Sequence, residues 1–349
     1  MKIVYVAHSL LNRGGDKMVL AHAGWLVAHG HEVELCCNVV DTVLQIPGGV
    51  RVSKPYFHGT LGTVVSALLQ RRDADIVLAS IIPMACFLYP RSGRRVVYFA
   101  QDYSDSYYTS PFLRGLIRLL NCAGLRLFHI PVIAVSSHLA DMLKKRYLAR
   151  VKVAENGVDT EVFFPDPDVE LIDGKVSRKA LLLLSRNDPG KGFDIAQSVV
   201  RRLSAEMPGT FEVWTVGERC NGIFDGIIHR DFGYVSEERL RQIMSSADMF
   251  LYPTRHEGFG LMPLEAFACR CPVVTTDAVI FASHLENALV APVGDVGLLS
   301  TYTLQILSGS VPIDALTNNG LQSAEKMSLK RTLVRFASIL ERQVSGERH

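Results

Sequence analysis

The stretch DMFLYPTRHEGFGLMPLEAFACRCPVVTT, residues 248–276, contains a complete strand, loop, helix and second strand. The apolar run DMFLYPT suits a buried strand, two glycines mark the loop, residues 260–270 have the composition of a helix, and PVVTT suits the next strand. Strands that alternate with helices in this way predict a parallel, doubly wound sheet with helices on both faces.

The same alternation runs along the first half of the chain. The run KIVYVAHS predicts a strand, HSLLNRGGDK a loop, KMVLAHAGWLVAHG a helix that ends at Gly30, and HEVELCC the next strand. Further strands are predicted at 75–79, 95–100 and 132–136, with helices near 60–71, 111–124 and 137–148.

Residues 156–178 interrupt this alternation, because Pro165 and Pro167 with their acidic neighbours are typical of a linker. The alternation resumes at the apolar strand KALLLLS and continues through the strand FEVWTVG and the helix SEERLRQIMSSA. The chain is also longer than one hydrophobic core normally supports. We therefore expect an α/β protein with two Rossmann-like domains, over residues 1–160 and 161–326, and a final helix in 327–349 that packs back across the first domain.

Composition and charge exclude several classes of protein. Hydrophobic residues make up 48% of the 349 and charged residues 21%, as in ordinary globular proteins, and the net charge of +2 gives no argument for a nucleic-acid partner. The seven cysteines form no CxxC pair, which indicates a reducing, cytoplasmic setting. The first apolar run is too short for a signal peptide, and SIIPMACFLYP falls well below the roughly 20 residues that span a bilayer.

The loop after DMFLYPT carries the first candidate site residues. Parallel sheets bind ligands at the carboxyl ends of their strands, which is where Glu257 is predicted to lie. Gly258 and Gly260 permit a positive φ and a close backbone approach, and the amides at the start of the following helix suit an anion. Glu265 lies about one turn further into that helix, roughly 7 Å along its axis at 1.5 Å per residue. Two acceptors that flank an anion site suit a ligand with hydroxyls on both sides of a diphosphate, although a surface glutamate beside a capped helix has the same spacing.

A second loop of this kind is SRNDPGKGFD, which also follows a strand and carries Arg186 and Lys191. An arginine binds phosphate in a bidentate manner, and a lysine acts as a point charge. The alternative is a solvated turn with its lysine on the surface. The presence of a second loop suited to phosphate favours the binding interpretation.

These residues resemble a known family. The segments SRNDPGKG (185–192) and ADMFLYPTRHEGFGLMPLEAFACRCPVV (247–274) look like the donor half of the GT4-type, retaining GT-B glycosyltransferases, whose signature is two glutamates separated by seven residues, here Glu257 and Glu265. RGGDK, GHEV (30–33), VSSHLADML and NGVD (156–159) resemble further family segments, so the resemblance extends through most of the chain.

The resemblance implies a GT-B fold, in which two Rossmann-like domains face each other across a cleft, and it implies roles for individual residues. Arg186 and Lys191 would bind the diphosphate of a nucleotide sugar and stabilise the leaving phosphate. Glu265 would accept hydrogen bonds from the ribose, and Glu257 would contact the sugar hydroxyls. Further donor contacts would come from Gly14, Gly15, Gly233, Tyr234, Gly258, Phe259, Gly260 and Leu261.

The sequence departs from the family in two places. Where the family often has a histidine near the reacting sugar, this chain has Gln101 and Asp102 in YFAQDYSDSYY. Glutamine exchanges no proton, so Gln101 would only hydrogen-bond, whereas Asp102 would orient or deprotonate the acceptor hydroxyl, or merely cap the next turn. The second departure follows Asp277, where AVIFASHLENALVAP replaces a loop that carries paired glycines and a glutamate in many members.

No metal or cofactor is expected beyond the nucleotide-sugar donor itself. The DxD pairs Asp73/Asp75 and Asp166/Asp168 precede a strand and lie in the linker, respectively, and are interpreted as structural. No zinc-ligand spacing occurs, and the first loop lacks the GxGxxG of dinucleotide-dependent oxidoreductases.

Residues 111–152 carry eight basic side chains against one acidic side chain, Asp141. A pair of helices with solvated basic faces would explain this composition. Apolar residues interleaved with arginine in PFLRGLIRLLNCAGLRLF favour an amphipathic surface that lies on an anionic membrane. The protein would then be cytoplasmic and peripheral on the inner face of the membrane, and a glycan or lipid-linked acceptor would fit.

The sequence thus predicts a metal-independent, retaining glycosyltransferase that transfers a hexosyl or deoxyhexosyl group in bacterial cell-surface polysaccharide, lipopolysaccharide or glycolipid synthesis. Two alternatives stay open. One is a GT-B nucleotide-sugar epimerase in which Asp102 or Glu257 acts as acid or base, and the other is a GT-B binding protein without turnover.

Overall fold

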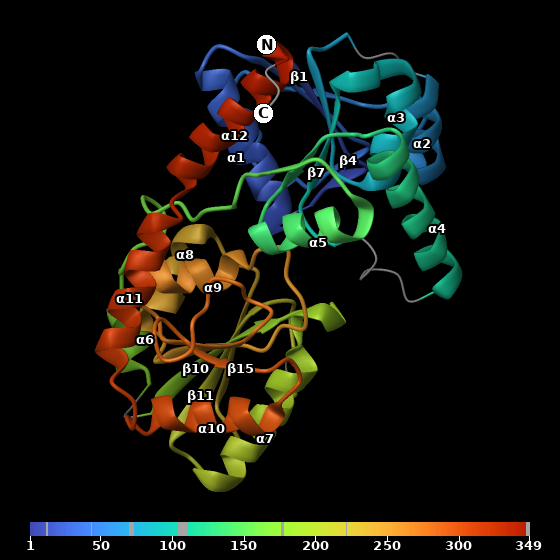
Figure 1. Ribbon diagram of the computed structural model, residues 1–349. Helices are drawn as coiled ribbons and strands as arrows, with labels where there is room; N and C mark the ends of the chain where they lie inside the picture. The colour runs from blue at the N-terminus through green and yellow to red at the C-terminus, as the bar shows by residue number, and fades with distance from the viewer. Residues whose placement is uncertain are drawn as a thin grey trace. The chain divides into compact units, whose positions relative to one another are not determined.

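The computed structural model describes residues 1–11, 13–42, 44–69, 73–103, 110–175, 178–220 and 222–346. The chain divides into two compact units, shown in Figure 1. Unit 1 comprises Met1–Asn156 and Lys330–His349, and unit 2 comprises Gly157–Leu329. The chain passes from unit 1 to unit 2 after Asn156 and returns at Lys330, so the final helix belongs with the first half of the sequence.

Unit 1 is built on a seven-stranded parallel sheet in the order β5-β3-β1-β6-β7-β8-β9. Its strands are β1 (Lys2–Val6), β3 (Glu32–Cys36), β5 (Arg51–Ser53), β6 (Ile76–Ala79), β7 (Val96–Ala100), β8 (Val132–Ala134) and β9 (Val151–Val153). The strands β2 (Ser9–Leu10) and β4 (Val39–Val40) form a separate two-stranded parallel sheet. The strands predicted at 75–79, 95–100 and 132–136 are thereby confirmed to within two residues.

The helices of unit 1 are α1 (Gly14–Ala28), α2 (Gly59–Leu69), α3 (Ile82–Ser92), α4 (Pro111–Asn121), α5 (Ser137–Tyr147) and α12 (Leu329–Ser345), with a 3-10 turn at η1 (Gly93–Arg95). The helix predicted over 111–124 continues past α4 as a π-helix, η3 (Cys122–Leu127). At the join, Asn121 is buried and donates from its side-chain amide to the Ile117 carbonyl.

Aromatic packing holds α12 on the body of unit 1. The His22 ring of α1 stacks on Phe336 of α12 with centroids 3.9 Å apart, and Phe99 of β7 contacts both rings edge-on at 5.4 Å. The Thr332 hydroxyl also donates to the Glu155 carbonyl at 2.7 Å. His22 is almost fully buried, and neither of its ring nitrogens has a hydrogen-bond partner among the described residues.

Unit 2 contains a six-stranded parallel sheet in the order β12-β11-β10-β13-β14-β15. Its strands are β10 (Lys179–Ser185), β11 (Phe211–Gly217), β12 (His229–Gly233), β13 (Met249–Tyr252), β14 (Val273–Thr276) and β15 (Leu289–Ala291). Its helices are α6 (Val169–Asp173), α7 (Phe193–Glu206), α8 (Glu237–Ser246), α9 (Leu261–Ala268), α10 (Val296–Leu307) and α11 (Ile313–Lys326), with a 3-10 turn at η4 (Pro189–Lys191).

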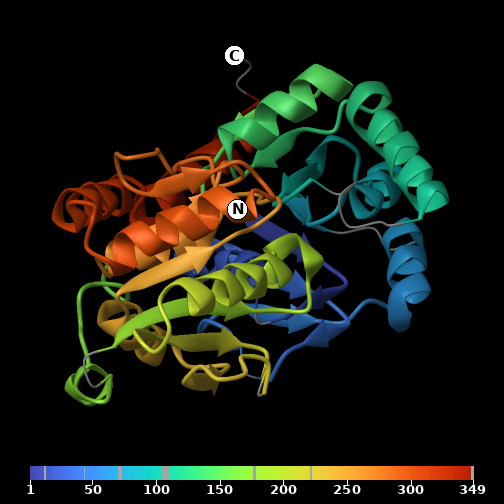
Figure 2. The same cartoon turned by 90° about the horizontal axis from the view of Figure 1, so that it is seen from below.

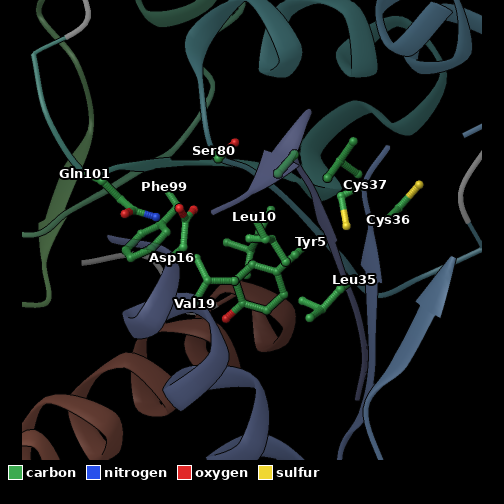
Figure 3. A pocket seen from close by; sticks show the side chains of 13 residues that line it. Tyr5, Leu10, Asp16, Val19, Leu35, Cys36, Cys37, Ser80, Phe99 and Gln101 are labelled. Atoms are coloured by element: carbon green, nitrogen blue, oxygen red, sulfur yellow. The ribbon is translucent and has the colours of Figure 1, made fainter. Parts of the chain in front are cut away.

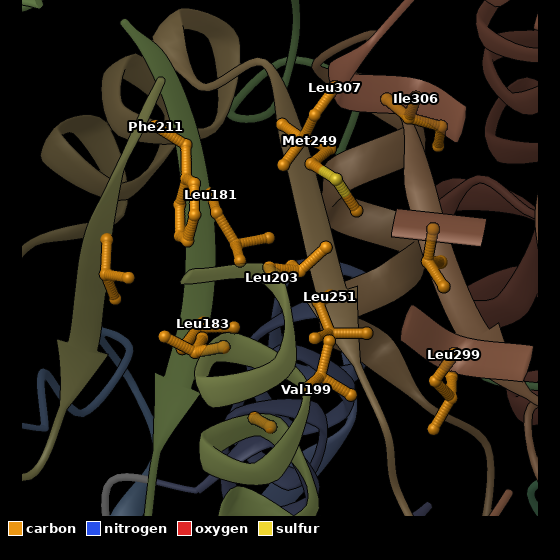
Figure 4. Packing of buried hydrophobic residues seen from close by; sticks show 14 of the residues in the cluster. Leu181, Leu183, Val199, Leu203, Phe211, Met249, Leu251, Leu299, Ile306 and Leu307 are labelled. Carbon is orange, nitrogen blue, oxygen red and sulfur yellow. The ribbon is translucent and has the colours of Figure 1, made fainter. Parts of the chain in front are cut away.

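The core of unit 2 explains why β10 is a continuous apolar run. Helices α7 and α10 cover one face of the sheet (Figure 2), and Leu181 and Leu183 meet Val199 and Leu299 there (Figure 4). Leu182 points to the other face and is equally buried. Both faces of the strand are therefore covered, as expected for a central strand of a parallel sheet.

The predicted linker is ordered where acidic side chains tie it to α8. Asp166 pairs with Arg241 at 2.9 Å, and Asp168 pairs with Arg239 while its Oδ1 caps α6 by accepting from the Leu171 amide. In unit 1, Asp75 accepts from the Lys2 amide at 2.7 Å. These contacts support the structural interpretation of both DxD pairs.

Candidate active site

The two loops predicted to bind a donor follow neighbouring strands. Arg186 follows β10 and the loop to Glu257 follows β13, and these two parallel strands pair in register, with Leu183 opposite Leu251. Both loops therefore leave the same edge of the sheet of unit 2. This is the edge at which open α/β sheets bind ligands.

Glu257 is the centre of a hydrogen-bonded cluster, and its side chain is 7% exposed. Its Oε1 accepts from the Lys191 ammonium at 2.8 Å, the Tyr252 hydroxyl at 2.6 Å and the Thr254 hydroxyl at 3.0 Å. A carboxylate so deeply buried needs such donors, because desolvation penalises its charge. The structure thus brings the predicted residues Lys191 and Glu257 into direct contact.

The electrostatics around Tyr252 place two further predicted residues near this cluster. Burial raises the pKa of the Tyr252 hydroxyl well above its ordinary value, and the Glu257 carboxylate raises it further. Arg186 lowers this pKa and Glu265 raises it, so both charges lie within electrostatic reach of the same hydroxyl. Tyr252 therefore stays protonated at neutral pH and remains a donor to Glu257.

The backbone joins the two loops. The Gly190 carbonyl accepts from the Arg255 amide at 2.7 Å, and the Thr254 hydroxyl oxygen lies 2.9 Å from the same carbonyl oxygen. Gly192 has a φ of +70°, and a Cβ there would lie 1.9 Å from the Pro253 carbonyl oxygen. Only glycine permits this approach, which fixes Lys191 beside Glu257.

Arg255 has a structural role distinct from that of Arg186. It forms a bidentate pair with Asp194 at 2.8 and 2.7 Å and donates to the Pro189 carbonyl at 2.6 Å. Asp188 accepts from the Gly190 amide at 2.9 Å and so shapes the same turn. The loop that carries Lys191 is therefore held from both sides.

The start of α9 follows directly after Glu257. Gly260 precedes this helix with a φ of +99° and, as a glycine, has no side chain with which to cap the helix start. The first amides of α9, from Leu261 onward, are thus suited to an anionic ligand. Phe259 is buried against Phe281, with ring centroids 5.2 Å apart, so its side chain anchors the loop. Of the two glycines that permit a positive φ, Gly258 and Gly260, only Gly260 has one.

Gly233 and Tyr234 lie at the end of β12, which is two strands away from β10. Gly233 has a φ of +67°, its amide donates to Asp231 at 3.1 Å, and a Cβ there would lie 2.6 Å from Nε of Arg219. Tyr234 is 61% exposed. The sequence analysis missed Arg219, since nothing in the sequence places its side chain over Gly233.

In unit 1, Gly14 and Gly15 form the first residues of α1, and neither has a positive φ. A Cβ on Gly15 would lie 2.0 Å from Oε1 of Gln101, so a larger residue here would displace the end of the glutamine side chain. Gln101 and Asp102 follow β7, and Asp102 accepts from the Tyr103 amide at 2.6 Å. Residues 104–108 of the stretch YFAQDYSDSYY lie outside the described residues.

A small cavity of about 20 Å³ lies beside these residues (Figure 3). Tyr5, Asp16, Phe99 and Gln101 are among its lining residues, and Asp16 accepts from the Leu11 amide at 3.0 Å. Burial raises the pKa of the Asp16 carboxyl. The cavity is large enough for about one water molecule and too small for a nucleotide.

Among the described residues, no group of three or more His, Cys, Asp or Glu side chains is arranged to hold a metal ion. No helix in the described part of the chain combines the length and apolar character needed to cross a bilayer.

Two parallel-sheet units, with an arginine, a lysine and two glutamates at the carboxyl edge of the second, have the features of a GT-B protein. Comparison with known families agrees: the Glycosyltransferase Family 4 profile matches residues 12–162, and the Glycosyl transferases group 1 profile matches residues 178–308. The chain belongs to the GT4-type glycosyltransferase family.

Curated relatives match parts of the chain. O-antigen chain mannosyltransferase B of Escherichia coli is 37% identical over 117 residues, which are 33% of this chain and 30% of that protein. Alpha-galactosylglucosyldiacylglycerol synthase of Streptococcus pneumoniae is 27% identical over 233 residues, which are 60% of this chain and 61% of that protein. The matches thus span less than two thirds of either relative.

Solved structures share the fold over the whole chain. Sucrose-phosphate synthase from Thermosynechococcus elongatus superposes with a TM-score of 0.84 at 14% identity, over 99% of this chain and 100% of that one. Anabaena Alr3699/HepE in complex with UDP and glucose superposes with a TM-score of 0.77 at 19% identity, over 98% and 99%. At these identities the likeness establishes the GT-B fold alone.

Proposed function

We propose that this protein is a retaining glycosyltransferase that moves a sugar from a nucleotide-diphosphate sugar to a hydroxyl acceptor in the assembly of a bacterial cell-surface polysaccharide, lipopolysaccharide or glycolipid. The names of the two curated relatives, an O-antigen mannosyltransferase and a glycolipid synthase, support this class of product.

The observation that carries the proposal is the Lys191–Glu257 pair at the carboxyl edge of unit 2, with Arg186 and Glu265 in electrostatic reach. An ammonium held by a buried carboxylate is fixed in position before a ligand arrives, which lowers the cost of ordering it. Arg186, Lys191 and the first amides of α9 would bind the diphosphate. Glu265 would accept from the ribose, and Glu257 from the sugar hydroxyls. The HepE complex with UDP and glucose makes a UDP-sugar the first donor to try.

In the reaction, the bond between the anomeric carbon and the diphosphate oxygen breaks while the acceptor oxygen bonds to the same face of that carbon. The negative charge that develops on the diphosphate would be stabilised by Arg186, Lys191 and the α9 amides, which are fixed by the fold. We propose that these groups supply the stabilisation without a metal ion.

Unit 1 would bind the acceptor. Asp102 would orient the acceptor hydroxyl or take its proton, and Gln101 would donate from its amide to a sugar oxygen. The Gln101 side chain lies close to Gly15, one of the proposed donor-binding residues.

An exposed amphipathic helix supports a membrane-bound acceptor. In α4 only Ile117 and Asn121 are buried, whereas Phe112 is 78% and Leu119 65% exposed. Leu127 of the following π-helix is 71% exposed. With Arg114, Arg118 and Arg126 along the same segment, this surface suits an anionic leaflet, where each cation contributes about 1 kcal/mol. Double replacement Phe112→Ser and Leu119→Ser should abolish cosedimentation with vesicles of anionic phospholipid, and unchanged binding would exclude α4.

A panel of nucleotide sugars with an acceptor extract tests the proposal. Acceptor-dependent release of one nucleoside diphosphate, with retained anomeric configuration in the product, supports it. Release of free nucleotide without acceptor would indicate the epimerase alternative, and tight donor binding without turnover would indicate the binding protein.

A further inference from the structure

A basic groove in unit 1 is lined by none of the candidate donor-binding or catalytic residues. It has a volume of about 820 Å³ and lies between β9 and one face of α12. Five cations line it, with Val153, Val334 and Ile339 between them, and none of the described lining residues is acidic. The cations are Lys152, Lys330, Arg331, Arg335 and Arg342.

The helical side of the groove is one continuous face. Its α12 residues run from Lys330 to Arg342, about three turns or roughly 18 Å at 1.5 Å per residue. The opposite face of the helix, with Leu333, Phe336 and Leu340, is buried in unit 1. The cations are therefore held on a helix that packing keeps in place.

The strand side of the groove offers backbone groups. Among the residues that the structure describes, β9 is the last strand of its sheet and pairs with β8 alone. Its bonds to β8 come from every second residue, since Arg150 accepts from Val132 and Ala154 donates to Ala134. The intervening residues Val151 and Val153 therefore direct their N–H and C=O groups to the open edge, where an added strand would bind.

We propose that this groove binds an extended acidic segment of a partner protein, which adds to the edge of β9 and places carboxylates opposite the cations of α12. Charge complementarity selects an anionic occupant, and the open strand edge selects a peptide backbone. A bilayer surface is planar and does not enter a groove. The helix proposed above to bind the membrane, α4, lies on the side of unit 1 away from α12 (Figures 1 and 2).

The test uses the full-length protein and a fluorescein-labelled peptide of eight alternating glutamates and valines, followed by fluorescence anisotropy at low salt. Saturable binding is expected, which weakens at least tenfold in the double variant Lys152→Glu, Arg335→Glu. The variant Arg201→Glu, Arg202→Glu, which reverses two exposed charges on α7, should bind like the wild type. A peptide with lysine in place of glutamate should not bind.

A second pair of probes separates strand addition from simple charge attraction. The pair consists of an eight-residue peptide of alternating aspartates and valines and the same peptide with every second backbone amide N-methylated. The two peptides have the same charges, but the methylated one lacks half of the N–H donors and should bind at least fivefold more weakly. Equal binding of the two forms would overturn strand addition. The proposal would be overturned if the Glu/Val peptide bound equally to the wild type and to the double variant Lys152→Glu, Arg335→Glu. It would also be overturned if this double variant lost binding to anionic vesicles but not to the peptide.

Discussion

Replacing Glu257 is the perturbation with the clearest consequence in unit 2. Lys191, Tyr252 and Thr254 all donate to the same carboxylate oxygen. Glu257→Gln keeps an acceptor oxygen but removes its negative charge, so the bonds from the Tyr252 and Thr254 hydroxyls become neutral. Since a hydrogen bond to a charged group contributes about 1.5–3 kcal/mol and a neutral one about 0.5–1.5 kcal/mol, the bonds from Tyr252 and Thr254 should each weaken by about 1–1.5 kcal/mol.

Glu257→Ala removes the acceptor altogether. It leaves the fully buried Tyr252 hydroxyl and the mostly buried Lys191 ammonium without this partner, and each orphaned group costs about 1–3 kcal/mol. Lys191 is 20% exposed and water replaces part of its loss, so the total should be about 3 kcal/mol. Turnover should fall by about 10²–10³, the range for removal of one electrostatic group from a transition state.

The assay exploits the two tryptophans of the chain, Trp25 in unit 1 and Trp214 in the core of unit 2. In a Trp25→Phe background, urea unfolding followed by fluorescence reports unit 2 alone. Glu170→Ala, which removes an exposed glutamate from α6, is the matched control and should change stability by less than about 0.5 kcal/mol. Glu257→Ala with wild-type stability and turnover would refute the reasoning.

Three further predictions concern single positions. His22→Phe should remove a pH dependence from unit 1, because burial lowers the pKa of His22 from 6.5 to about 3 and the unfolded chain therefore binds a proton that the folded chain does not. Between pH 6.5 and 3 the free energy of unfolding of the wild type should fall by up to about 4 kcal/mol more than that of the variant. Urea unfolding followed by Trp25 fluorescence in a Trp214→Phe background measures this difference. Gly192→Ala should lower the free energy of unfolding of unit 2 by about 3 kcal/mol or more and abolish donor binding, because Gly192 has a positive φ and lies against the Pro253 carbonyl. Wild-type affinity in a titration with donor would show that the junction of the two loops is not needed for binding. Gly15→Ala should cost about 1 kcal/mol in the wild type and nothing in a Gln101→Ala background, and equal costs in the two backgrounds would show that the contact between these residues is not limiting.

The sequence predicts the fold well because apolar runs such as KALLLLS are buried on both faces and have few alternatives to a central parallel strand. It also predicts which residues gather at the carboxyl edge of unit 2, since Lys191 and Glu257 follow neighbouring strands. It does not predict that they form an ion pair, because this depends on the approach of the Gly192 backbone to Pro253.

Other features depend on contacts between residues far apart in sequence. Tyr252 and Thr254 belong to an apolar strand pattern, and only the folded loop shows that their hydroxyls serve Glu257. Likewise, the contact between Gln101 and Gly15 joins the segment after β7 to the start of α1, 86 residues apart, and the π-helix after α4 has no signal in its apolar pattern. The sequence also does not show which of the two loop glycines adopts a positive φ, and in the structure it is Gly260, at the turn into α9.

The central claim is that the carboxyl edge of unit 2 binds a nucleotide-sugar donor. Calorimetric titration with UDP, GDP, dTDP and ADP, without added metal, on the wild type and on Glu265→Ala tests it most directly. We predict that one nucleotide binds and that the replacement weakens it at least tenfold, as expected for loss of an acceptor to the ribose hydroxyls. Binding of none of the four, or equal binding to both proteins, would contradict the account.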